Sequence, residues 1–131
     1  MQRSLALLEG GGLRLQLGDD RHALRPCQDA IDFCGEVPAS AELDGGPIID
    51  LNLMSRRNAW RQRLWHLHLD GERRLDNDAD VLLLLCRVGR LQAHGWSLQA
   101  GQAMLLEDER GELRLHGQGA CLHVAELRRR P

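Results

Sequence analysis

Residues 45–54, GGPIIDLNLM, join a turn signal to an alternating strand, and they set the interpretation of the whole chain. The Gly-Gly-Pro start favours a turn, because glycine adopts backbone angles that other residues avoid and proline cannot donate a ladder hydrogen bond. The residues that follow alternate with a period of two, as side chains do along a β-strand. One face holds Ile49, Leu51 and Leu53, and the other holds Ile48, Asp50, Asn52, Met54 and Arg56. The segment therefore predicts a strand with one apolar and one polar face.

The polar face of this strand has two interpretations. Asp50 and Asn52 are poor strand formers, so they lie either on a solvated outer face or inside a cavity that supplies partners. In a cavity, Arg3 or Arg56 could pair with Asp50, and Glu9 is a second polar candidate for the same space. The amide of Asn52 both donates and accepts hydrogen bonds, which suits a ligand with carboxylate and amide or imidazole groups.

Strand patterns dominate the rest of the chain. Apolar and polar residues alternate in segments 13–17, 64–69, 113–116 and 121–127. The continuous apolar run 81–86 is typical of a strand buried on both faces. Short clusters of Gly, Asp, Asn and Pro, including 117–119, separate these segments and are expected to be turns. The spacing predicts an all-β sandwich or barrel.

An internal repeat predicts two similar β units. The apolar strand, glycine turn and returning strand of residues 5–13 recur at residues 81–91, and two later landmarks recur in the same order. We therefore expect units at residues 1–58 and 59–131, packed tightly as one structural domain. The second unit has an extra strand, residues 64–69, ahead of its first landmark, so the first unit is expected to be incomplete on its N-terminal side.

Composition limits the classes of partner. The formal net charge is −2, which gives no electrostatic reason to expect nucleic acid or an anionic membrane as a partner. The longest apolar run, 81–86, is far shorter than the roughly 20 residues of a membrane helix, and no signal-peptide pattern opens the chain. We expect a cytoplasmic protein whose four scattered cysteines are reduced thiols.

A metal site is the main chemical alternative. His66 and His68 alternate along a predicted strand and Glu72 follows, which is similar to the ligand pattern of catalytic cupins. Trp60 stands where that pattern needs a glycine, and the simpler interpretation is a partly exposed histidine face. No serine or cysteine has the context of a catalytic nucleophile, and no cofactor is predicted.

Three blocks resemble, in order and spacing, the HutD family, a bacterial group encoded with histidine-utilisation genes. They are LALLEGGGLRL at 5–15, AIDFCGE at 30–36 and DGGPIIDLNLM at 44–54, and LHVAEL at 122–127 extends the resemblance over most of the chain. The resemblance implies a cupin-like bicupin fold, two β-barrel halves in one chain. It also implies a non-enzymatic protein that adjusts histidine catabolism by binding a small acidic metabolite such as urocanate or formylglutamate.

The resemblance favours ligand contact for Asp50 and Asn52, with Glu9, Arg3 and Arg56 as further candidates. Family members also carry an earlier Trp-x-Asn-Gly-Gly-Gly segment that contributes to the shared site, and it is not in this sequence. The expectation is therefore an incomplete first barrel with unpaired sheet edges. A homodimer through those edges would cover them, and the alternative is an interaction-only remnant with no functional pocket.

Overall fold

The computed structural model describes all 131 residues and contains eleven β-strands and no helix. The strands are β1 (Gln2–Glu9), β2 (Leu13–Leu17), β3 (Asp20–Leu24), β4 (Ile31–Cys34), β5 (Ala39–Leu43), β6 (Ile49–Ser55), β7 (Trp60–Asn77), β8 (Val81–Ala93), β9 (Trp96–Gln99), β10 (Ala103–Glu107) and β11 (Gly111–Arg129). The predicted all-β class is confirmed. With only strands and turns present, the chain has no helix that could cross a membrane.

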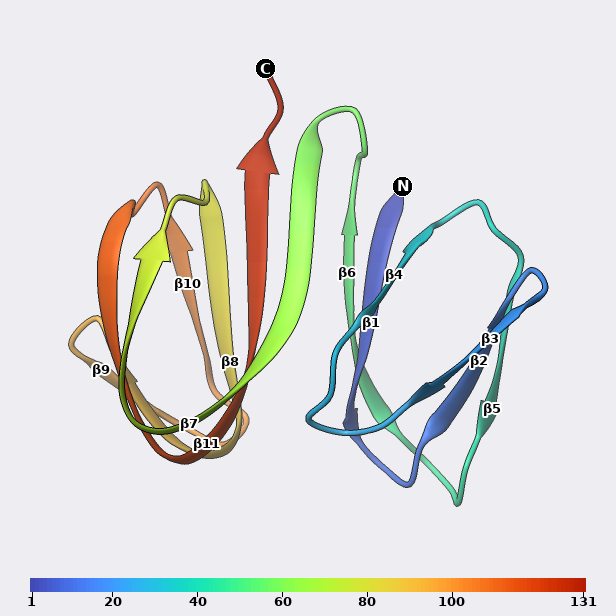
Figure 1. Cartoon of the computed structure of the whole chain (residues 1–131), viewed down its shortest axis with the longest axis horizontal. Helices are drawn as coiled ribbons and strands as arrows, with labels where there is room; N and C mark the ends of the chain where they lie inside the picture. The colour runs from blue at the N-terminus through green and yellow to red at the C-terminus, as the bar shows by residue number, and fades with distance from the viewer.

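Strands β1–β6 form a first unit made of two small antiparallel sheets, on the right in Figure 1. Their strand orders are β4-β1-β6 and β3-β2-β5. In β2 every second residue is buried, as the LRLQL alternation predicts. The core between the two sheets contains Leu5, Leu7, Leu13, Leu15, Leu17, Leu24 and Phe33.

Strands β7–β11 form a second unit built from one strongly bent sheet of order β10-β8-β11-β7, with β9 also paired to β8 (Figure 1). The early part of β11 pairs with the end of β8, and the late part of β11 pairs with its start. The bend thus folds one set of strands into two layers. Its core includes Leu82, Leu84, Leu91, Leu115 and Leu122, all without exposed surface.

Glycines sit where the long strands bend. Gly71, Gly89 and Gly119 have positive φ, and a Cβ added to Gly89 would collide with the carbonyl oxygens of Gln118 and Gly119. Residues 117–119 were expected to separate two strands, and this was wrong: β11 continues through them with a bulge between Gly117 and Ala120. Glycine here lets a strand change direction without ending it.

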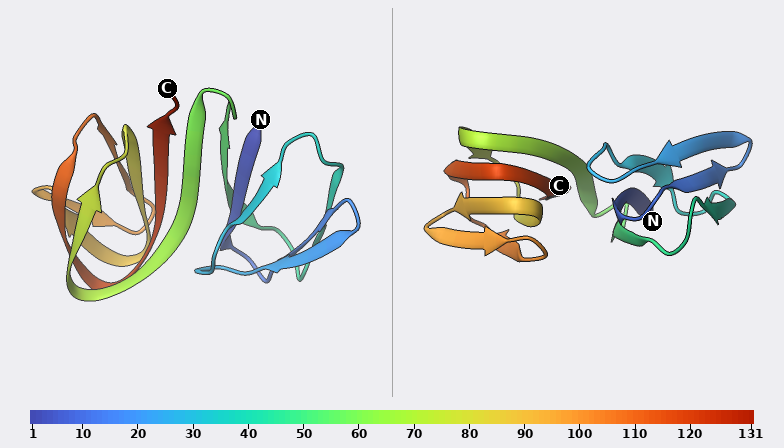
Figure 2. Two further views of the ribbon diagram at one scale, coloured as in Figure 1. Left: turned by 45° about the horizontal axis from the view of Figure 1, so that its top comes forward. Right: turned by 90° about the horizontal axis from the view of Figure 1, so that it is seen from below.

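The two units pack side by side through one face of β1 and β6 and one face of β7, β8 and β11 (Figure 2). We call this contact the seam; its apolar members are Ala6, Ala30, Leu51, Leu53, Leu64, Leu83 and Ala125. Along β7, Leu67 and Leu69 enter the second core, and the alternate residue Leu64 enters the seam. The predicted alternation of residues 64–69 is confirmed.

A disulfide also joins the units. Cys27, in the connection between β3 and β4, is bonded to Cys121 on β11, with their Cα atoms 6.4 Å apart. The expectation that all four cysteines are free thiols was therefore wrong, and only Cys34 and Cys86 are free. The two partners are 94 residues apart and meet only because the units pack together.

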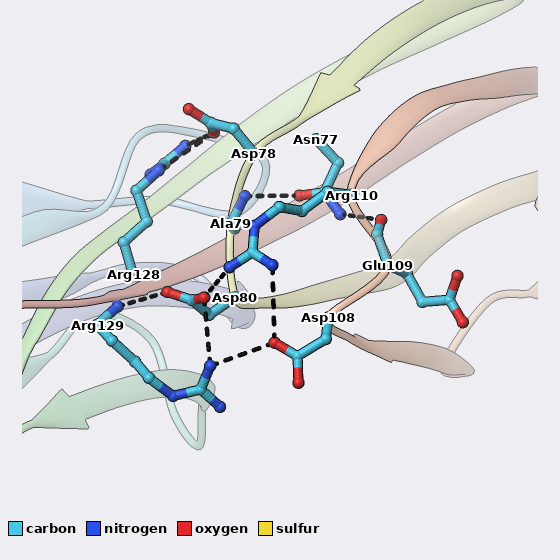
Figure 3. Close-up of polar contacts among 9 residues, drawn as sticks. All are labelled: Asn77, Asp78, Ala79, Asp80, Asp108, Glu109, Arg110, Arg128 and Arg129. Atoms are coloured by element: carbon cyan, nitrogen blue, oxygen red, sulfur yellow. Dashed lines mark hydrogen bonds and ion pairs between the residues drawn. The ribbon is translucent and has the colours of Figure 1, made fainter.

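Charged side chains tie together three segments of the second unit, as Figure 3 shows. Asp80, only 8% exposed, accepts a 2.6 Å hydrogen bond from the backbone N–H of Arg129 and forms ion pairs with the side chains of Arg110 and Arg129. Arg128 pairs with Asp78 in the same turn between β7 and β8. These contacts fix the start of β8 against the end of β11.

Candidate functional site

The polar residues of β6 lie on the core side of their sheet. Asp50 is the cross-strand partner of Leu7, and Asn52 is the partner of Leu5, so each shares a face with a buried leucine of the first core. Both polar side chains are nevertheless exposed, because β6 is an edge strand paired only with β1. Neither makes a side-chain hydrogen bond or an ion pair. Asp50 and Asn52 thus form an open polar face beside an apolar core.

Arg3 lies on the same face, opposite Met54 on β6. Its guanidinium carbon is 4.9 Å from the ring centroid of Phe33, a cation–π contact at the edge of the first core. The Nε atom of Arg3 is buried and has no hydrogen-bond acceptor. This face, which we call the β6 face (Arg3, Asp50, Asn52 and Met54), therefore combines a guanidinium, a carboxylate and an amide.

The structure places the other two candidates elsewhere. The carboxylate of Glu9 accepts a 2.5 Å hydrogen bond from Nη2 of Arg87 on β8, so it bridges the two units instead of sharing a cavity with Asp50. Arg56 lies exposed in the turn before β7, where its carbonyl accepts hydrogen bonds from the backbone of Ala59 and Trp60. Neither Arg3 nor Arg56 forms an ion pair with Asp50.

The histidine-based alternative is not assembled as predicted. Nδ1 of His66 lies 2.9 Å from a carboxylate oxygen of Asp29, and Nε2 of His68 lies 3.3 Å from the carbonyl oxygen of Cys27. Glu72 lies beyond the Gly71 bend and lines a different cleft, of about 370 Å³. No group of three His, Cys, Asp or Glu side chains is placed to hold a metal ion.

His123 has an environment that the sequence did not reveal. It lies on β11 opposite His66, is 1% exposed, and has no hydrogen-bond partner at either ring nitrogen. Burial, and after it the electrostatic effect of the nearby His66 and Arg87 side chains, lowers the pKa of His123 to about 4. The ring is therefore neutral at neutral pH. In the sequence, the only sign of this environment is that His123 lies two residues from Cys121 and two from Ala125. All three therefore share the face of β11 that packs in the seam.

A polar network at the seam was also missed by sequence reasoning. Nε2 of Gln62 donates to Oγ of Ser4 at 2.8 Å and to the carbonyl oxygen of Leu53 at 3.0 Å. Oγ of Ser4 donates to Asp32, and Oγ of Ser55 donates to Oε1 of Gln62. Gln62 of β7 thereby satisfies polar groups of the first unit, which fixes the register of the two units.

The paired β units, with bent strands shared between two layers, define an all-β protein of the cupin-like class. A cupin 2 conserved barrel domain protein from Leptotrichia buccalis has the same fold, with a TM-score of 0.52, 8% identity, and coverage of 98% of this chain and 74% of that chain. The sequence model of the HutD family matches residues 1–123, and the chain belongs to the HutD family.

Two solved structures share the fold closely. HutD from Pseudomonas fluorescens SBW25 has a TM-score of 0.85 at 25% identity, with 99% of this chain and 69% of that chain covered. A conserved protein of unknown function from Pseudomonas aeruginosa PAO1 also has a TM-score of 0.85, at 30% identity, with 98% and 72% covered.

A curated relative gives the genetic setting. It is an uncharacterized 21.2 kDa protein in the hutC 3′ region of Pseudomonas putida, 40% identical over 85 residues. The match spans 63% of this chain and 43% of the relative. The family thus relates to a histidine-utilisation locus.

Proposed function

We propose that this chain is a non-enzymatic binding protein that adjusts histidine utilisation by recognising a small acidic metabolite, with urocanate or formylglutamate as the ligand. Membership of the HutD family supports the pathway. The main support for the binding site is the β6 face, where Asp50 and Asn52 project beside the first core without partners in the chain. Polar groups in such a position remain available to a ligand.

The chemistry of the β6 face suits these compounds. A ligand carboxylate would pair with the Arg3 guanidinium, an imidazole or amide N–H would donate to Asp50, and Asn52 can do either. Asp50 lies four residues along β6 from Met54, the partner of Arg3, which is about 13 Å of extended strand. The Arg3 guanidinium, which lies over Phe33, and the Asp50 carboxylate are therefore assigned to separate groups of the ligand.

The proposed partner protein is a second copy of the chain. Leu43 on β5 and Met54 on β6 are 52% and 53% exposed, and both strands are sheet edges. Antiparallel pairing of two β6 edges would extend the sheet and place two β6 faces next to each other. Sedimentation equilibrium tests this point: a strict monomer at high concentration would contradict it.

Calorimetric titration with urocanate and with formylglutamate tests the ligand. We expect saturable binding of at least one compound, lost in Asp50→Ala and weakened in Arg3→Ala. The matched control is Glu107→Ala, which removes an exposed carboxylate from β10 and should bind normally. No saturable binding of either compound would overturn the ligand assignment, and chemical conversion of a bound compound would overturn the non-enzymatic assignment.

A further inference from the structure

The seam brings together two cysteines and three histidines from three segments of the chain. Cys121 and His123 project from one face of β11, and His66 and His68 project from the same face of β7. The register pairs Cys121 with His68 and His123 with His66, so the four residues form a square on two adjacent strands. Cys27, from the connection between β3 and β4, lies over this square through its bond to Cys121.

Three of these residues are already close to one another. Cross-strand partners have Cβ atoms about 4.5–5.5 Å apart, which brings the ring of His68 beside the sulfur of Cys121. Nε2 of His68 is 3.3 Å from the carbonyl oxygen of Cys27, so the same ring also lies against the second cysteine. Two sulfurs and one imidazole therefore share one small region.

The hydrogen-bond partners of His66 and His123 indicate which of the two is the fourth residue of the cluster. His66 is engaged, because its Nδ1 is 2.9 Å from the carboxylate of Asp29. His123 is buried and neither ring nitrogen has a partner. A buried imidazole without a hydrogen bond carries a desolvation cost that a bound ligand would offset.

We propose that the reduced protein binds one Zn²⁺ through Cys27, Cys121, His68 and His123, and that the disulfide and the metal exclude each other. Two thiolates and two imidazoles are a common structural zinc set, with tetrahedral geometry. Zn–S bonds of about 2.3 Å place the sulfurs about 3.8 Å apart. The Cα separation of 6.4 Å accommodates that change. While the sulfurs are bonded to each other they cannot act as thiolates, so the proposal concerns only the reduced protein; the disulfide form holds no group of three metal ligands.

The chemistry of the switch balances with a dithiol reductant. The reductant breaks the sulfur–sulfur bond, supplies two electrons and two protons to give the Cys27 and Cys121 thiols, and itself closes to a cyclic disulfide. Zn²⁺ then displaces the two thiol protons into the buffer. The cluster bridges both units, so either form, disulfide or metal, keeps them joined.

The test uses the full chain in both redox forms. Protein reduced with dithiothreitol and freed of reductant under argon is titrated with Zn²⁺ and, separately, with Co²⁺. We expect one tight equivalent, release of two protons, and a thiolate-to-cobalt charge-transfer absorption. The disulfide form should bind neither ion. Reduced protein that takes up no metal, or disulfide protein that takes up as much, would overturn the proposal.

Variants test three of the four proposed ligands. Cys27→Ser, Cys121→Ser and His68→Gln should each weaken binding by at least about tenfold. His68 is exposed, so His68→Gln is the variant that tests the site without disturbing packing. Cys34→Ser and His116→Gln, which change a free cysteine and an exposed histidine outside the cluster, should bind normally. Unchanged affinity in His68→Gln, or equal loss in the two controls, would contradict the assignment.

Discussion

Nη2 of Arg87 in the second unit donates a 2.5 Å hydrogen bond to the carboxylate of Glu9 in the first unit. Nε of the same arginine donates to the carbonyl oxygen of Leu8 at 2.8 Å. One side chain of β8 therefore holds the end of β1 at two points, and the contact lies beside the seam.

This relationship predicts a measurable coupling between the units. In a double-mutant cycle of Glu9→Ala and Arg87→Ala, we expect an interaction energy of about 0.5–1 kcal/mol, since the Arg87 side chain is only 21% exposed. The matched control is Arg74 with Glu112, 63% and 52% exposed, whose coupling should be near zero. Urea unfolding of the four proteins in each cycle measures both values, and equal couplings would contradict the prediction.

His123 predicts a loss of stability in mild acid. The pKa of its ring is lowered to about 4 in the folded protein, below its value in the unfolded chain, so the unfolded state binds more protons between those values. The free energy of unfolding of the disulfide form should fall as the pH drops from about 7 towards about 4, by up to about 3 kcal/mol from this group. His123→Leu should lose this part of the pH dependence, and His116→Gln should keep it. If the free energies of unfolding of the wild type and of His123→Leu differ by the same amount at every pH, the prediction is ruled out.

Removing the disulfide should destabilise the chain. The bond closes a loop between residues 94 apart, for which chain entropy gives a stabilisation of about 4–5 kcal/mol. We expect Cys27→Ala to lower the free energy of unfolding by an amount of that order in metal-free buffer, and Cys34→Ala to have little effect. Denaturant titration with and without reductant provides the measurement, and reductant should not change the Cys27→Ala protein further.

The contacts of Asp80 predict that the turn between β7 and β8 loses stability in acid. The hydrogen bond from the backbone of Arg129, and then the charges of Arg110 and Arg129, hold the pKa of Asp80 below its ordinary value. The contribution of Asp80 to stability is present above the pKa that Asp80 has in the unfolded chain. It is lost as the pH falls through the lower pKa that Asp80 has in the folded protein. Asp80→Asn should lower the thermal midpoint at neutral pH and flatten the acid limb, whereas Glu107→Gln should do neither. Thermal scans across the acid range decide between these outcomes.

The sequence predicted the all-β class and the faces of several strands because period-two alternation follows directly from strand geometry. Leu67 and Leu69 in the core, with His66 on the opposite face, illustrate this success. The glycines of residues 117–119 were misread, because local composition does not distinguish a bend that continues a strand from a turn that ends it.

Long-range pairing was beyond sequence reasoning. Nothing local links Cys27 with Cys121 or Glu9 with Arg87, since each pair forms only when two distant units pack. For Asp50 and Asn52 the sequence offered a solvated face or a cavity wall, and the structure combines features of both because β6 is an edge strand. The division at residue 58 and the ligand contacts stay predictions.

Alternate residues of β6 have different surroundings. Leu51 and Leu53 hold the units together, while Asp50 and Asn52 meet solvent on the other side. Consecutive positions along a single backbone thus have different packing requirements. Genetic variation in this strand should spread unevenly, with every second residue constrained by the contact between the units and its neighbours free of that constraint.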